Sequence, residues 1–143
     1  MKAVRRLTAV LATFAIVALS AGPAHADELP TGCRDSEGHN HEFSGWAYYT
    51  TDGAYHSWYE FRYLIWNNAT GGKSNVDITV NENFTVNYRY RSPDDRKHDV
   101  LYTLRPPVPV TTRVQFPEFT EFYVVFDERN SGDPHCTAGT DYI

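Results

Sequence analysis

Aromatic and charged residues alternate between positions 43 and 66 in a pattern that could bind a ligand. If Asp52 and Gly53 form a two-residue turn, the segments on either side pair as antiparallel strands, and alternation divides their side chains between two faces. Tyr49 then lies opposite His56. One face is almost entirely apolar, which predicts that it faces the core. Its residues are Trp46, Tyr48, Tyr55, Tyr59, Phe61, Tyr63 and Ile65.

The opposite face of this hairpin combines flat rings with an acid, a base and an imidazole. Such rings stack on the C–H faces of sugars while polar groups hydrogen-bond the hydroxyls, and Trp, Tyr and Arg are also common in protein interfaces. We therefore predict a recognition face for an extracellular polysaccharide or for a secreted or cell-surface protein. The alternative is that loops cover both faces and the rings only pack. The candidate ligand-binding residues are Tyr49, His56, Trp58, Glu60, Arg62 and Trp66.

A second candidate site is the proline-rich segment at residues 104–110. Its prolines favour a rigid, extended path that has little conformational entropy to lose on binding. Such a loop is typical of an inhibitor of a secreted hydrolase, but prolines also interrupt edge strands and carry a chain between sheets. The residues of the inhibitor hypothesis are Arg105, Pro106, Pro107 and Val108.

Two further clusters are explained by a solvated surface. His39 and His41 are spaced so that both imidazoles lie on one side of an extended chain, and a third histidine could complete a zinc or copper site. The sequence lacks the ligand spacings of zinc fingers and metalloproteases, so we predict a polar segment and no metal. Basic residues also gather around a turn at 92–95, where aspartates neutralise them: Arg89, Arg91, Arg96, Lys97 and His98.

Catalytic motifs are missing from the sequence. It contains no G-x-S-x-G nucleophile turn, no glycine-rich phosphate loop and no acidic calcium loop. We therefore predict a protein that is not an enzyme and uses no cofactor. A small secreted hydrolase or toxin remains an alternative, because carboxylates are plentiful and only a structure can show which of them lie together.

The elements that would position these residues are β-strands. Apolar and polar residues alternate at 76–80, 84–90 and 110–116, which predicts strands with one buried face. Residues 119–126 are apolar on both faces, as in a central strand, and a shorter strand is expected at 100–104. With the hairpin, these segments predict an all-β, antiparallel sandwich of six to seven strands and immunoglobulin-like architecture. A small open barrel is the alternative, and the polar residues 27–41 are predicted to be irregular.

The N-terminal residues indicate export. Three basic residues precede an apolar stretch at 7–19, and an A-x-A pattern follows at 24–26, which together are typical of a signal peptide. We predict that residues 1–26 are the signal peptide and that residues 27–143 form a single secreted domain, extracellular or associated with the cell wall. The apolar stretch is too short to span a membrane, so no membrane insertion is expected.

The cysteine count and the charge agree with a secreted domain. In an oxidising compartment, Cys33 and Cys136 predict one disulfide that closes a loop of about 100 residues. The net charge is −5, and the predicted signal peptide contains basic but no acidic residues, so the secreted domain is more acidic still. This acidity argues against a nucleic-acid partner. N-glycosylation patterns begin at Asn68 and Asn83.

Overall fold

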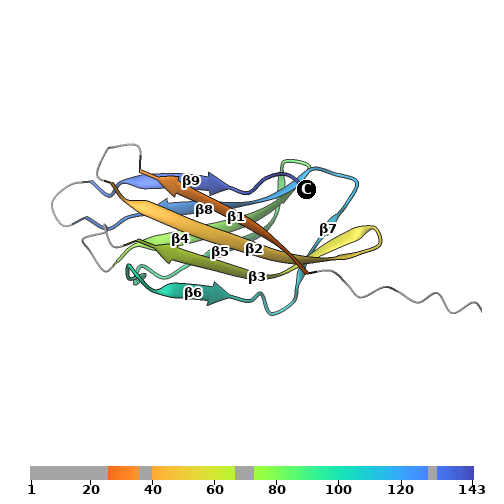
Figure 1. Ribbon diagram of the computed structural model, residues 1–143, viewed down its shortest axis with the longest axis horizontal. Coiled ribbons are helices and arrows are strands. Elements are labelled where there is room, and N and C mark those ends of the chain that lie inside the picture. Colours follow the sequence, from red (N-terminus) through yellow and green to blue (C-terminus); the bar gives the residue numbers. More distant parts are fainter. Residues whose placement is uncertain (1–25, 36–39, 67–72, 129–131) are drawn as a thin grey trace, which may run out of the picture.

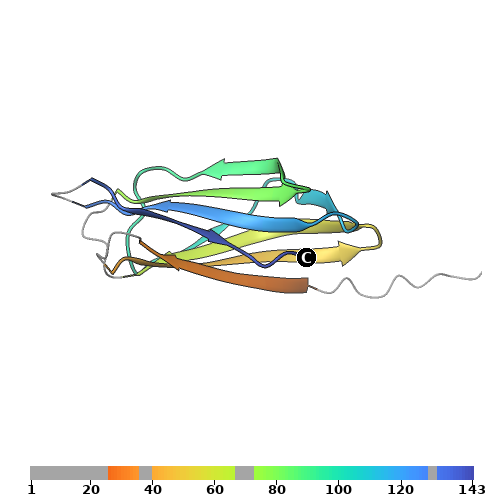
Figure 2. The same cartoon turned by 90° about the horizontal axis from the view of Figure 1, so that it is seen from above.

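The protein folds as two antiparallel β-sheets packed face to face (Figures 1 and 2). The computed structural model describes residues 26–35, 40–66, 73–128 and 132–143. One sheet has the order β1-β2-β3-β6, with β7 also paired to β3, and the other has the order β5-β4-β8-β9. The strands in these residues are β1 (Ala26–Arg34), β2 (Glu42–Asp52), β3 (Tyr55–Ile65), β4 (Asn75–Glu82), β5 (Thr85–Arg91), β6 (Leu101–Leu104), β7 (Val110–Arg113), β8 (Glu118–Val125) and β9 (His135–Gly139).

The predicted all-β sandwich is confirmed, and the sheets do not close into a barrel. Val76, Ile78 and Val80 of β4 are completely buried, as their alternation predicts. Strand β8 lies between β4 and β9, which confirms the central position expected from its apolar residues. Across the core, the sheet that contains β2 and β3 contributes mainly aromatic rings, such as Phe43 and Phe61. Of the six buried Val and Ile side chains among the described residues, four are in β4 and β8: Val76, Ile78, Val80 and Val124.

One edge of the sandwich is closed by the predicted disulfide. Cys33 in β1 and Cys136 in β9 are bonded, with their Cα atoms 6.0 Å apart. Next to this bond, the hydroxyl of Thr31 donates a hydrogen bond of 2.7 Å to the carbonyl of Gly139. The disulfide therefore joins the outermost strands of the two sheets.

Strand β1 corrects the prediction that residues 27–41 are irregular. Ala26–Arg34 is a strand, paired with β2 from Ala26 opposite Thr50 to Arg34 opposite Glu42. Its side chains are exposed or half-buried, because an edge strand gains much of its stability from backbone pairing. The low apolar content of this segment therefore hid it. Strand β9 is short and was missed in the same way, so the described residues contain nine strands rather than six or seven.

The turn of the predicted β2–β3 hairpin lies one residue later than expected. Its two residues are Gly53 and Ala54, and Asp52 pairs with Tyr55. Gly53 has a φ of 58°, a left-handed conformation in which a side chain would be strained. Glycine therefore sets where the chain reverses.

A β-bulge in the hairpin changes which residues face the core. Tyr49 pairs with Trp58 and Tyr48 with Glu60, so the extra residue Tyr59 has no partner on β2. Beyond an unpaired residue in one strand, the odd-numbered and even-numbered side chains exchange faces of the sheet. Core-facing positions of β3 are therefore even-numbered before the bulge and odd-numbered after it; Glu60, directly after the bulge and opposite Tyr48, is also buried.

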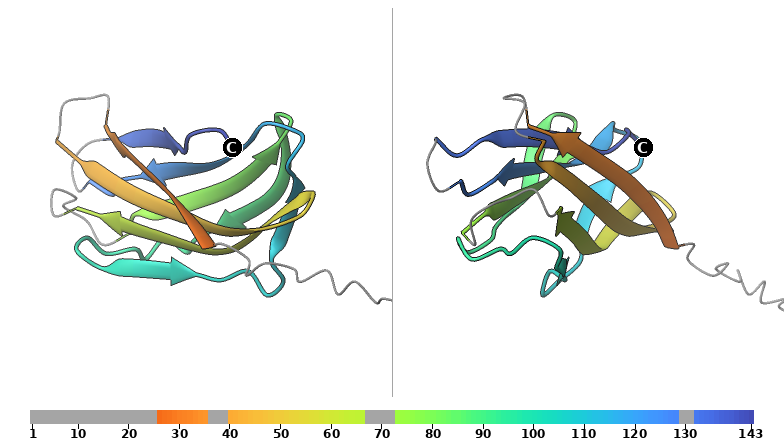
Figure 3. Two further views of the ribbon diagram at one scale, coloured as in Figure 1. Left: turned by 45° about the vertical axis from the view of Figure 1, so that its right-hand side comes forward. Right: turned by 60° about the vertical axis from the view of Figure 1, so that its left-hand side comes forward.

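The outer edge of β3 is covered by an interrupted strand. Strand β6 pairs with the second half of β3 and β7 with the first half, both antiparallel. The proline-rich segment 105–109 connects the two (Figure 3). It lies beside the bulge, because Leu104 pairs with Phe61 and Val110 pairs with Trp58. Proline cannot donate a ladder hydrogen bond, which explains why pairing stops there. The segment therefore interrupts an edge strand, as one interpretation predicts, but it connects two strands of the same sheet and does not carry the chain between sheets.

A candidate binding face on the outer side of the β2–β3 hairpin

A line of aromatic side chains lies on the solvent side of the β2–β3 hairpin. In β2, Gly45 and Ala47 face inward, and a Cβ added to Gly45 would lie 3.2 Å from the ring of Phe122 in the opposite sheet. Alternation then turns Trp46 and Tyr48 outward. In β3, Tyr59 at the bulge and Tyr55 at the hairpin end also point outward. Trp66, directly after the strand, is the fifth ring. We call this line the outer aromatic face; it consists of Trp46, Tyr48, Tyr55, Tyr59 and Trp66.

Contacts position three of the rings of the outer aromatic face. Tyr55 and Trp66, at its two ends, are exposed, and the three central rings are half-buried. The indole N–H of Trp66 donates a hydrogen bond of 3.0 Å to the hydroxyl of Ser44, which fixes that ring on the sheet. The centroids of the Tyr48 and Tyr59 rings are 6.4 Å apart. Trp66, Tyr48 and Tyr59 therefore have defined neighbours on the sheet.

A buried carboxylate organises the charged centre of this face. Glu60 is only 4% exposed, yet it hydrogen-bonds two arginines. The Nε atom of Arg62 donates to one of its oxygens at 2.5 Å, and that of Arg105 donates to the other at 2.6 Å. Burial by itself would raise the pKa of Glu60, but the hydrogen bonds and charges of Arg105 and Arg62 outweigh it and lower the pKa below its ordinary value. Glu60 is therefore ionised at neutral pH.

Tyr48 links the charged centre to the neighbouring strand. The guanidinium carbon of Arg62 lies 4.8 Å from the centroid of the Tyr48 ring, which is the geometry of a cation–π contact. On its other side, Tyr48 pairs with Glu28 of β1. Burial and the hydrogen bond to Glu28 raise the pKa of the Tyr48 hydroxyl. The phenol therefore stays neutral and can donate a hydrogen bond.

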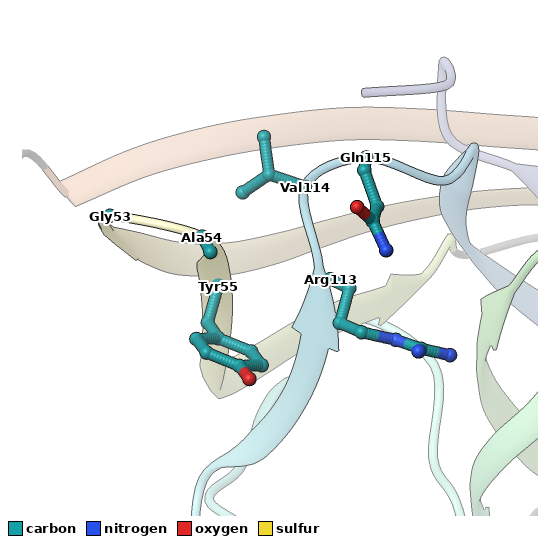
Figure 4. Close-up of a pocket in the computed structure, with 6 residues that line it drawn as sticks. All are labelled: Gly53, Ala54, Tyr55, Arg113, Val114 and Gln115. Carbon is teal, nitrogen blue, oxygen red and sulfur yellow. The ribbon is translucent and has the colours of Figure 1, made fainter.

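A shallow pocket lies at the turn end of the outer aromatic face (Figure 4). Its volume is about 390 Å³, and Tyr55 belongs both to the pocket and to the face. Figure 4 shows the guanidinium of Arg113 pointing away from the Tyr55 ring; its Nε atom donates to Glu82 at 2.6 Å. The lining residues are Gly53, Ala54, Tyr55, Arg113, Val114 and Gln115.

Three predicted ligand-binding residues are in the core, so their assignment to an exposed face was wrong. Trp58 is completely buried, and Tyr49 and His56 nearly so. The indole N–H of Trp58 donates a hydrogen bond of 2.7 Å to the hydroxyl of Thr112, and Nδ1 of His56 lies 3.0 Å from the carboxylate of Glu118. The indole N–H of Trp58 and Nδ1 of His56 therefore have partners inside the core that are more than 50 residues away in the sequence.

The other three predicted residues lie together on the outer face. Glu60 and Arg62 form its charged centre, and Trp66 lies at one end of it. The prediction that the first four rings of the apolar set face the core was wrong for Trp46, Tyr48, Tyr55 and Tyr59, whereas Phe61, Tyr63 and Ile65 are buried as predicted. One pattern in the sequence could have indicated which side chains of β2 face the core. In residues 45–48, small residues alternate with large ones, and only the small ones fit against the rings of the opposite sheet.

The proline-rich loop presents a small exposed apolar tip. Pro106 is buried, Pro107 is exposed, and Val108 is 74% exposed. Arg105, one of the four residues of the inhibitor hypothesis, is hydrogen-bonded to Glu60. The loop therefore contributes Arg105 to the outer face.

The remaining clusters are held by pairing within the protein. His41 is buried rather than solvated, which corrects the prediction, and it hydrogen-bonds Glu128 at 2.6 Å; His39 is outside the described residues, as is Asn68. Arg91 and Arg96 are paired with aspartates.

Within the described part of the chain, no group of three or more His, Cys, Asp or Glu side chains could hold a metal. In the same residues, no helix is long and apolar enough to cross a membrane.

The outer side of the β2–β3 hairpin thus combines aromatic rings, a buried carboxylate and two arginines. This combination suits stacking and charged hydrogen bonding, and the pocket at its turn end is shallow. In comparisons with known proteins, the chain matches no family model, no curated protein and no solved structure.

Proposed function

We propose that this protein is a secreted, non-enzymatic binding module that holds an extracellular polysaccharide on its outer aromatic face. The observation that carries the proposal is the line of rings from Trp66 through Trp46 and Tyr48 to Tyr55, along one hairpin. Flat rings offer apolar surface to the C–H faces of sugar rings, and a ring that retains a polar edge suits a partly wet interface.

The spacing of the rings favours a polymer over a small molecule. Side chains two residues apart on a strand are separated by about 7 Å, because each residue advances the strand by about 3.3 Å. Trp46 and Tyr48 have this relation. Small-molecule sites are concave and bury most of their ligand, whereas these rings lie across a sheet. A long chain with repeated contacts would gain most from such a surface.

The disulfide, the N-terminal sequence and the composition support an extracellular role. The Cys33–Cys136 disulfide is of a kind that persists in oxidising compartments, and the N-terminal sequence has the pattern of a signal peptide. The acidic composition keeps such a domain soluble. These observations support the secretion that the proposal requires.

The experiment that tests this proposal is retention on insoluble polysaccharides. Purified protein is mixed with a panel of polysaccharides, and the bound fraction is measured at low and high salt. Replacing Trp46 and Tyr48 together by Ala should weaken binding by about tenfold or more, since each aromatic contact contributes roughly 1 kcal/mol. Tyr123→Ala, an exposed tyrosine on the outer side of the other sheet, is the matched control and should bind as the unmodified protein does.

Retention of the Trp46→Ala/Tyr48→Ala protein at unmodified strength would contradict the proposal, as would failure of the unmodified protein to bind any polysaccharide. In the second case, the exposed tip of the proline-rich loop at Val108 favours inhibition of a secreted hydrolase. Stoichiometric loss of activity in a panel of secreted proteases and amylases would then identify the target.

A further inference from the structure

The two arginines at the centre of the outer aromatic face are held by one buried carboxylate. Arg62 and Arg105 each use the Nε atom for Glu60, and each donates to a different oxygen. The two guanidiniums therefore lie beside one another. Their side chains are 40% and 70% exposed, respectively, although Glu60 beneath them is almost inaccessible. Among the described residues, no hydrogen bond occupies the terminal nitrogens of either guanidinium.

Both arginines are fixed before any ligand arrives. Arg62 lies over the Tyr48 ring, and Arg105 precedes the buried Pro106, where the proline-rich loop begins. Fixing a side chain in its bound conformation removes the entropy cost of ordering it on binding. With Glu60 ionised, the three groups together have a charge of +1 on an otherwise acidic protein.

We propose that Arg62 and Arg105 bind carboxylate groups of an acidic polysaccharide, so that the ligand of the outer aromatic face is a polymer that contains uronic acids. This inference rests on the proposed function and names its ligand class. A guanidinium presents two parallel N–H donors that match the two oxygens of a carboxylate. The neighbouring aromatic rings would hold the sugar rings, and the arginine pair would select the charged ones.

The charges around this pair favour a local contact over general attraction to anions. Glu28 lies on the far side of Tyr48 from Glu60, and its carboxylate accepts a hydrogen bond from the Tyr48 hydroxyl. The whole chain has a net charge of −5, so a polyanion is repelled at long range. Binding must therefore come from direct contacts between guanidinium and carboxylate.

The experiment compares ligands that differ only in the carboxylate. Polygalacturonate and alginate are each offered in the acid form and in the methyl-esterified form, together with a neutral polysaccharide, and affinities are measured by isothermal titration. The acid forms should bind at least about tenfold more tightly than the esters, because a charged hydrogen-bonded pair contributes about 1.5–3 kcal/mol.

Variants test whether the arginine pair is responsible for the preference for the acid form. Arg105→Gln should lose most of the preference for the acid form over the ester. Arg91→Gln is the matched control, because Arg91 is an exposed, ion-paired arginine on the other sheet, and it should keep the preference. Thermal unfolding of each variant checks that the fold is retained.

Each result separates this inference from the proposed function. Equal binding of acid and ester, or an Arg105→Gln protein that still prefers the acid, would overturn the carboxylate site and leave polysaccharide binding intact. Failure to bind any of the polymers would overturn the proposed function and this inference together.

Discussion

At the scale of single residues, four buried side chains of this protein are joined in one hydrogen-bonded set. Trp58 donates to Thr112, Thr112 donates to Glu118, and His56 contacts the same carboxylate. All four side chains are buried. A buried polar group without a partner costs more free energy than its hydrogen bond contributes. The set therefore explains why a tryptophan and a histidine, which looked like ligand-binding residues, are core residues.

Thr112→Val tests this set at a single atom. Valine has nearly the same shape but cannot accept from the Trp58 indole or donate to Glu118, so the free energy of unfolding should fall by about 2–3 kcal/mol. Chemical denaturation followed by fluorescence measures it. Thr111→Val, on the exposed neighbouring residue, should change stability by less than about 0.5 kcal/mol. Equal effects of the two substitutions would show that the hydrogen bonds of Thr112 contribute nothing.

At the scale of strands and turns, the sequence predicted seven strands and missed the edge strands β1 and β9. The sequence pattern identified β4 by its alternation, with Val76, Ile78 and Val80 buried, and β8 by its apolar residues on both faces. It could not identify β1, which is held by backbone pairing and a disulfide. It also could not show the bulge at Tyr59, because the unpaired residue looks like its neighbours in the sequence. Because of this one residue, half of the predicted face assignments in the hairpin are reversed. Three of the six candidate ligand-binding residues therefore lie in the core.

The turn between β4 and β5 holds an aromatic residue in a conformation that suits glycine. Asn83 and Phe84 have φ angles of 48° and 60°, the left-handed pair that favours Asn-Gly in two-residue hairpins. Phe84 is 71% exposed, and its ring contacts those of Phe119 and Tyr142. The backbone strain of a left-handed Phe is of the order of 1–2 kcal/mol. Such strain is retained in proteins mainly where a surface is used.

Replacing Phe84 separates strain from ring contacts. Phe84→Gly should raise the free energy of unfolding by about 1 kcal/mol because the strain is relieved. Phe84→Ala keeps the strain and removes the ring, so it should be less stable than the glycine variant by about the same amount. Urea unfolding measures both. A glycine variant less stable than the unmodified protein would mean that the ring contacts outweigh the strain.

At the scale of the whole molecule, a single covalent bond joins the outer strands of two sheets. Cys33 and Cys136 are 103 positions apart, so the bond restricts most of the unfolded chain. The predicted fold class and the disulfide are confirmed because both follow from properties of the entire chain, namely alternation and an even number of cysteines. Positions on a particular face depend on register, which is set by local exceptions that composition does not reveal.

Removing the disulfide should therefore have a large effect. On the chain-entropy account, a loop of about 100 residues corresponds to roughly 4–5 kcal/mol of stability. The double variant Cys33→Ala/Cys136→Ala should unfold at a markedly lower guanidinium concentration than the oxidised protein. Each single variant, with an unpaired thiol kept reduced, should match the double variant. A loss below about 1 kcal/mol would show that pairing between β1 and β2 holds the edge without the bond.

The three tryptophans occupy three different environments: Trp58 is enclosed in the core, Trp46 is half-buried among the rings of the outer face, and Trp66 is exposed at its end. The molecule therefore contains its own optical probes. Emission from the enclosed indole reports on unfolding, and iodide quenching of the two surface indoles reports on occupancy of the face. Because the two signals arise from one chain, a ligand that covers the surface can be told apart from one that loosens the fold, with no label attached.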